Sequence, residues 1–184
     1  MKGLMSVSRN SMHKTYMLNE DGIDLCENQM IKQRSGAACV ILNNGYFWIV
    51  GGIRIFMHSD GPVDPGILCR SSTEFFSPFQ PPIRGPEMPF TISYHSMVQI
   101  SESRIFILGG ELNGSKSNKT WIVKCPFDGF EIEEGPPMNF ERSFHCSGMM
   151  MIGNEPTLIV AGGKNSDTVE ILSCFTNNQW MEGE

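Results

Sequence analysis

The feature that most constrains this chain is an internal repeat marked by three Gly-Gly pairs. Each pair ends an apolar run, and the pairs begin at positions 51, 109 and 162, so they are 58 and 53 residues apart. A second apolar stretch precedes each run, and turn residues such as Asn43-Asn44-Gly45 separate the two stretches. Asn-Gly between apolar runs is the strongest short hairpin signal. Each repeat unit therefore begins with a predicted β-hairpin.

Two more short strands are predicted in each unit after the Gly-Gly pair. The third strand is β-prone, as in residues 73–76, 120–123 and 169–172, and a Gly-Pro segment ending in Met follows the fourth strand at Gly85 and Gly135. Four short antiparallel strands with a period near 50 residues are typical of a β-propeller blade. The apolar runs are continuous because inner strands are buried on both faces.

The repeat divides the chain into five segments. Residues 1–13 are expected to be an N-terminal extension, and residues 14–34 the outer two strands of an incomplete blade, because Lys14-Thr15-Tyr16 matches Lys119-Thr120-Trp121. Blades are predicted over residues 35–92, 93–141 and 142–184, the last truncated at its end. The predicted fold is all-β, a partial propeller of about three and a half four-stranded blades.

The glycine pairs are expected to be structural, because Gly allows close backbone approach and unusual torsions. These glycines are Gly51, Gly52, Gly109, Gly110, Gly162 and Gly163. Together with the aromatic third strand and Trp180 near the end, they resemble the repeat of the kelch family, over about residues 14–184. The resemblance implies a kelch-type β-propeller.

Composition excludes several partners and sites. A net charge of −6 and a pI near 5.2 argue against nucleic-acid and anionic-membrane binding, and no apolar run reaches membrane-spanning length. The first residues do not read as a secretory signal, and the six cysteines form no CxxC pair, which argues against a zinc site. We expect a cytoplasmic location, free thiols, no metal and no cofactor.

The candidate site lies on one predicted face. In an antiparallel blade, the connection between the second and third strands and the connection into the next blade emerge on the same side. The first unit has a long second-to-third connection, residues 53–72, and loops of this length are usually functional or disordered. In kelch adaptors, residues of the inter-blade connection and those just after Gly-Gly contact the partner. The resemblance therefore implies partner-binding roles for Arg34, Ser35, Ser93, Asn113, Arg142, Ser143 and Lys164.

Two residue pairs also have structural explanations. Arg34 and Arg142 occupy equivalent positions, and a capping contact within the inter-blade connection is the alternative to partner binding. His95 and His145 are likewise equivalent in successive units, so repeat position explains them better than metal binding or catalysis does.

The predicted function is non-enzymatic protein–protein interaction. No P-loop, GxSxG or HExxH motif occurs, so no catalytic residue is assigned. Kelch resemblance implies substrate recognition for a cullin-type ubiquitin ligase, with a stand-alone actin-associated scaffold as the alternative. A kelch-fold sugar oxidase or isomerase is the rival of another class. The partner's identity is left open, and self-association through open blade edges is expected as well.

Overall fold

The computed structural model describes residues 3–6, 15–19, 22–56, 66–124, 126–174 and 179–183. Within these ranges the chain forms antiparallel β-sheets joined by turns, and none of the residues is helical. The described residues accordingly include no helix that could cross a membrane. The all-β class predicted from the repeat is confirmed.

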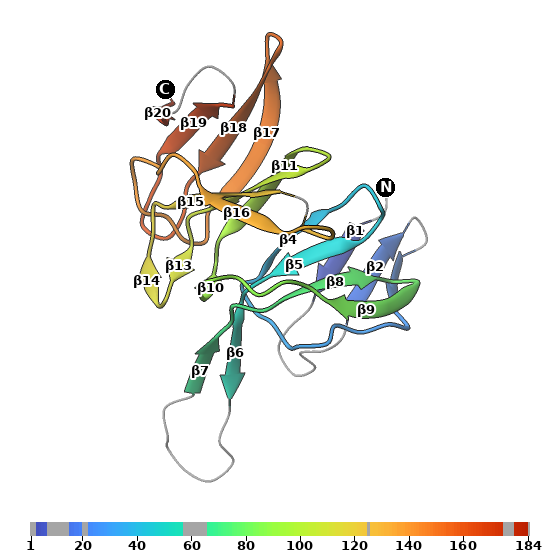
Figure 1. Ribbon diagram of the computed structural model, residues 1–184. Helices are drawn as coiled ribbons and strands as arrows, with labels where there is room; N and C mark the ends of the chain where they lie inside the picture. Colours follow the sequence, from blue (N-terminus) through green and yellow to red (C-terminus); the bar gives the residue numbers. More distant parts are fainter. Residues whose placement is uncertain are drawn as a thin grey trace.

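Three four-stranded sheets follow one another along the chain (Figure 1). We call them the first, second and third sheets, and in each the strand order in space is the order in sequence. The first contains β4 (Ala38–Ile41), β5 (Phe47–Val50), β8 (Thr73–Ser77) and β9 (Gln80–Arg84). The second contains β11 (Ser96–Ser101), β12 (Arg104–Leu108), β15 (Thr120–Lys124) and β16 (Glu131–Glu134). The third contains β17 (Cys146–Ile152), β18 (Glu155–Ala161), β19 (Val169–Ser173) and β20 (Met181–Glu182).

An N-terminal sheet precedes these three. It consists of β1 (Gly3–Ser6), β2 (Thr15–Asn19) and β3 (Gly22–Leu25), with β2 in the centre. The segment predicted as an extension, residues 1–13, thus supplies a strand, and the sheet has three strands where the sequence predicted two. Strand β1 escaped prediction because it is short and no Gly-Gly pair follows it.

Short hairpins lie in the connections between the second and third strands of the first and second sheets. The long connection of the first sheet contains β6 (Ile53–Phe56) and β7 (Gly66–Cys69), which pair with each other and extend away from the sheets (Figure 1). The tip of this connection, residues 57–65, lies outside the described residues. In the second sheet, β13 (Glu111–Leu112) and β14 (Ser115–Lys116) form a hairpin to which β10 (Ile92–Ser93) adds a third strand.

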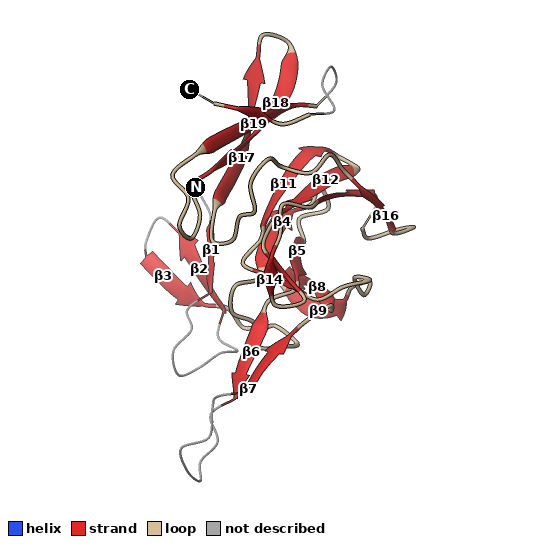
Figure 2. Cartoon of the chain, turned by 90° about the vertical axis from the view of Figure 1, so that its left-hand side faces the viewer, coloured by secondary structure: helices blue, strands red, loops and turns tan. Residues whose placement is uncertain are grey.

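Successive sheets pack face to face, and their first strands β4, β11 and β17 are neighbours (Figure 2). One apolar cluster joins the first and second sheets and includes Trp48, Ile107 and Trp121. A second cluster joins the second and third sheets through residues such as Phe106 and Leu158. A third, around Phe76, joins the N-terminal and first sheets. Burial of both faces explains the continuous apolar runs that the sequence shows.

The repeat glycines lie where one sheet meets the next. Gly51 has a φ of 63°, and a Cβ there would lie 2.2 Å from the carbonyl oxygen of Ile92. The neighbouring Gly52 N–H donates to that same oxygen at 2.8 Å, and Gly110 N–H donates to Arg142 O at 2.7 Å. Both the torsion and the closeness of the backbones require glycine.

The outermost strands of the first and second sheets carry residues typical of sheet edges. Strand β9 contains Pro81 and Pro82, and Pro is confined to edges or bulges because it lacks an N–H. Strand β16 contains the carboxylates Glu131, Glu133 and Glu134. Both strands are mostly exposed.

Candidate functional site

The candidate site is built from the connections that emerge on one side of the sheets. The β6–β7 and β13–β14 hairpins extend in the same general direction, away from the β4–β5, β11–β12 and β17–β18 turns (Figure 1). The residue after each Gly-Gly pair bonds to the segment that enters its own sheet. Ile53 N–H donates to Ser35 O at 2.8 Å, and Lys164 N–H donates to Ser143 O at 2.8 Å. The two kinds of connection therefore form a single surface, as the antiparallel topology predicts.

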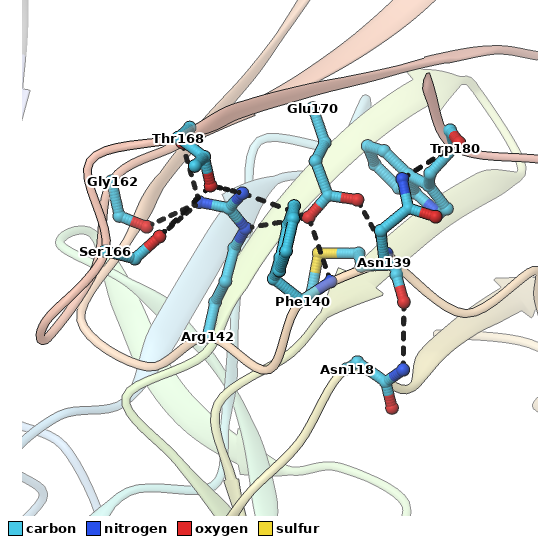
Figure 3. Close-up of polar contacts among 10 residues, drawn as sticks. Asn118, Asn139, Phe140, Arg142, Gly162, Ser166, Thr168, Glu170 and Trp180 are labelled. Carbon is cyan, nitrogen blue, oxygen red and sulfur yellow. Dashed lines mark hydrogen bonds and ion pairs between the residues drawn. The ribbon is translucent and has the colours of Figure 1, made fainter. Parts of the chain in front are cut away.

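Arg142 is buried beneath this surface, and its guanidinium points toward Glu170, Gly162 and Thr168 (Figure 3). Its side chain and that of Glu170 are fully buried, and the two form an ion pair at 3.0 Å. The guanidinium also donates to the carbonyl oxygens of Gly162 and Thr168, at 2.8 Å each, and to the Thr168 hydroxyl at 2.6 Å. Glu170 in turn accepts from the backbone N–H of Asn139 at 2.6 Å. The group thus ties the entering segment to strands β18 and β19.

Arg34 makes the same contacts in the first sheet. It pairs with Glu74, the side chains of both being 1% exposed, and donates to Gly51 O and Ser72 O at 2.6 and 2.7 Å. Neither guanidinium is available to a partner, because each is buried and bonded within the chain. The structure thus places both arginines in the capping role that sequence offered as the alternative, and it gives their predicted partner contact no support.

The second sheet replaces this ion pair with an apolar pair. By repeat position, Ile92 stands where the other sheets have Arg, and Trp121 stands where they have Glu. Both are buried members of the cluster between the first and second sheets. An ion pair and a well-packed apolar pair are interchangeable in a core only when both partners change, since a single change leaves a buried charge unpaired.

The three serines that were predicted to contact a partner are also buried or half-buried. Ser93 and Ser143 are fully buried, and their hydroxyls have no hydrogen-bond partner among the described residues. Ser35 is half-buried and exchanges backbone hydrogen bonds with Ile53. Serine is small enough for the close contact between the entering segment and the segment after each Gly-Gly pair. The structure does not place these side chains on the surface that a partner would meet.

Asn113 and Lys164 are the predicted partner-binding residues that are exposed. Asn113 lies at the turn of the β13–β14 hairpin with a φ of 50°, and its Oδ1 accepts from the Thr91 hydroxyl at 3.0 Å. Asn tolerates this left-handed conformation better than most residues. Lys164 follows the third Gly-Gly pair, and its carbonyl oxygen accepts from Lys116 Nζ at 2.7 Å. The β13–β14 hairpin and the β18–β19 turn are therefore linked at the surface.

The segments that enter the second and third sheets also form an aromatic stack, which was not predicted from the sequence. Gly36, Tyr94 and Phe144 are equivalent, and all three have a φ between 53° and 63°. Tyr94 N–H donates to Gly36 O at 2.7 Å, and Phe144 N–H donates to Tyr94 O at 2.9 Å. The Tyr94 and Phe144 rings stack at 3.9 Å, and Phe144 is 53% exposed. The repeated aromatic-His dipeptides at 94 and 144 were the available signal.

The two equivalent histidines, His95 and His145, directly follow the stacked residues in sequence and are buried. His145 Nε2 is 2.8 Å from the Ser96 hydroxyl, whereas neither ring nitrogen of His95 has a hydrogen-bond partner among the described residues. Burial, and then the nearby His145, lowers the pKa of His95 to about 3. Burial, and then the charge of Arg142, lowers the pKa of His145 to about 4. Both rings are therefore neutral at pH 7.

The described residues contain no cluster of three or more His, Cys, Asp or Glu placed to hold a metal ion. Burial raises the pKa of the Cys39 and Cys174 thiols, so their environment does not favour the reactive thiolate. What the surface offers is exposed amide, ammonium and aromatic groups on a framework of buried ion pairs. These groups suit hydrogen bonding and aromatic contact with another molecule.

Comparison with known proteins gives a match by structure alone. No family model matches the chain, and no curated protein does. A solved structure titled "Structure of YjhT" superposes with a TM-score of 0.70 at 10% sequence identity. The match covers 100% of this chain and 66% of that one. This chain is thus similar in fold to about two thirds of the YjhT structure.

Proposed function

We propose that this chain holds consecutive blades of a kelch-type β-propeller, three with four strands and one with three. Two features support the proposal: the face-to-face packing of sheets through equivalent contacts, and the meeting of their first strands β4, β11 and β17. The Gly-Gly pairs fall at equivalent places in the three four-stranded sheets, and the segments 85–88 and 135–138, which run from Gly-Pro to Met, follow the fourth strands of the first two.

Its function in this proposal is non-enzymatic binding of a protein partner. The observation that carries it is the surface formed by the β6–β7 hairpin, Asn113, Lys164 and the Tyr94–Phe144 stack on top of buried Arg–Glu pairs. A rigid framework lowers the entropy lost on binding, and aromatic groups contribute most where they are desolvated. We call this surface the hairpin face.

Variants of the hairpin face test the proposal. Asn113→Asp keeps the acceptor used by Thr91 but adds a charge, and Lys164→Glu reverses an exposed charge. A third variant replaces residues 55–67 with Asn-Gly, which removes most of the β6–β7 hairpin and keeps the Arg54–Leu68 pair. Lys124→Glu is the charge-reversal control, because Lys124 ends β15 on the opposite side and its side chain, which pairs with Glu133, is 41% exposed.

The measurement is affinity capture with quantitative mass spectrometry, followed by direct binding of each purified candidate. We expect a partner that binds wild type and the Lys124→Glu control and loses at least tenfold in affinity to the hairpin-face variants. A partner unaffected by all three variants would contradict the choice of face. A stoichiometric metal in the purified protein would contradict the non-enzymatic function.

A further inference from the structure

The third sheet leaves uncovered the face that its predecessors bury. Directly opposed residues of an antiparallel pair point to the same side, so Leu158, Val160 and Leu172 face the second sheet and are buried. The residues between them face the other way and line a shallow apolar groove. We call this side the open face, and it comprises Cys146, Gly148, Met150, Ile159, Ala161 and Ile171.

Equivalent positions in the first two sheets show what this face is built to receive. Val40 and Val50 of the first sheet pack against the second sheet, and Val98 and Leu108 of the second sheet pack against the third. At the same positions the open face has Gly148 and Ala161, which leave a hollow between Met150 and Ile159. The residues that line the groove carry no charge, and Met150 is 48% exposed. It therefore has space for a larger apolar group than those that the other interfaces accept.

The N-terminal sheet presents such a group on its outer side. Thr15 is buried, and Cys26, which donates its backbone N–H to Thr15 O, packs in the cluster with the first sheet. Tyr16, the neighbour of Thr15, therefore points to the opposite side of the sheet. Tyr16 pairs with Leu25, which is 53% exposed. By repeat position Tyr16 corresponds to Trp121, the residue that the second sheet packs into its cluster with the first. An aromatic residue at this position is thus what one sheet inserts against the sheet before it.

We propose that the open face binds the outer side of the N-terminal sheet of a second copy of this chain. Tyr16 and Leu25 of one copy then fill the hollow around Gly148 and Ala161 of the other, in the relation that consecutive sheets already have within the chain. Such a contact joins different surfaces of the two copies, so each dimer keeps one open face and one N-terminal sheet for further growth. The inference is independent of the function proposed for the hairpin face.

Two variants separate this contact from others. Met150→Glu places a charge on the open face, and Leu25→Glu places one on the N-terminal sheet. Each chain keeps the surface that the other has lost. Phe79→Glu is the control, because Phe79 is 74% exposed at the β8–β9 turn of the first sheet and belongs to neither surface. Gly148→Lys provides a second disruption of the open face, since an added Cβ there meets nothing within 4 Å.

Sedimentation velocity over a concentration series gives the result. We expect wild type and the Phe79→Glu control to associate, and each disrupting variant to remain monomeric with unchanged circular dichroism. Mixing Met150→Glu with Leu25→Glu restores association, which stops at two chains because one intact contact remains. A monomeric wild type, a disrupting variant that associates alone, or a mixture that stays monomeric would each overturn the proposal.

Discussion

At the residue scale, buried Arg–Glu pairs hold the segments that enter the first and third sheets. Replacing one of these ion pairs by the apolar pair of the second sheet tests whether the two pairs are equivalent. Arg34→Ile leaves Glu74 as an unpaired buried carboxylate, and we expect the free energy of unfolding to fall by about 3–5 kcal/mol. Adding Glu74→Trp reproduces the pair that the second sheet uses, so the double variant should recover much of this loss. Urea unfolding of the two single variants and the double variant measures the coupling. Strictly additive losses would contradict the equivalence of the two pairs.

The buried histidines predict how stability changes with pH. Their pKa values are about 3 and 4 in the folded chain and near 6.5 when unfolded. The unfolded state therefore binds more protons below pH 6.5, and the stabilisation present above this pH is lost as the pH falls towards 4. The unfolding free energy should fall by up to about 1.4 kcal/mol per pH unit for each histidine.

Urea unfolding at pH 7 and pH 5 tests this dependence. His95→Leu should flatten it, because this variant removes a buried titratable ring, and His145→Gln should do so while keeping a donor near the Ser96 hydroxyl. An equal decrease in wild type and both variants would assign the effect to other groups.

At the scale of the element, the Gly-Gly turns depend on two separate properties of glycine. Gly109 has a φ of 55°, and a Cβ there would lie 2.8 Å from Arg142 O. Gly114 also has a positive φ, of 88°, but nothing lies within 4 Å of its added Cβ. Gly114→Ala should therefore cost only the backbone strain, about 1–2 kcal/mol. Gly109→Ala should add an overpacking penalty of about 1–3 kcal/mol. Thermal unfolding of both variants compares them, and equal losses would rule out close approach as the cause.

Strand positions were predictable from sequence, but the use of individual residues was less so. The Gly-Gly pairs and apolar runs located the inner strands of the three four-stranded sheets, and the Gly-Pro segments marked the ends of the first two, because turn chemistry and apolar runs are local properties. The third blade was predicted to be truncated, whereas the third sheet has a short fourth strand, β20. Arg34, Ser93 and Arg142 were predicted to contact a partner, yet the structure buries them. The burial of the two arginines depends on Glu74 and Glu170, which lie 40 and 28 residues further along the chain. A contact of that range is not visible in a local pattern.

The aromatic stack is a second contact that a local sequence pattern does not reveal. The sequence reveals that Tyr94 and Phe144 are equivalent, but it does not show that their rings meet. The rings stack because both residues adopt left-handed backbone torsions, which are uncommon for aromatic residues.

At the scale of the whole molecule, the sheets form a series in which each contacts its neighbours. The second sheet is covered on both faces, whereas the N-terminal and third sheets lie at the two ends (Figure 1). Stability in such a series comes from each unit and from the interfaces between adjacent units. Exposed apolar side chains at the ends, such as Leu25 and Met150, follow from this arrangement.

The prolines of β9 limit how the molecule can aggregate. An incoming strand can extend a sheet only by pairing with backbone N–H and C=O groups along its rim, which is the first step of amyloid-type growth. Pro81 and Pro82 offer no N–H, and the carboxylates of β16 repel a copy of the same rim. Lateral fibril growth is therefore blocked along these two rims.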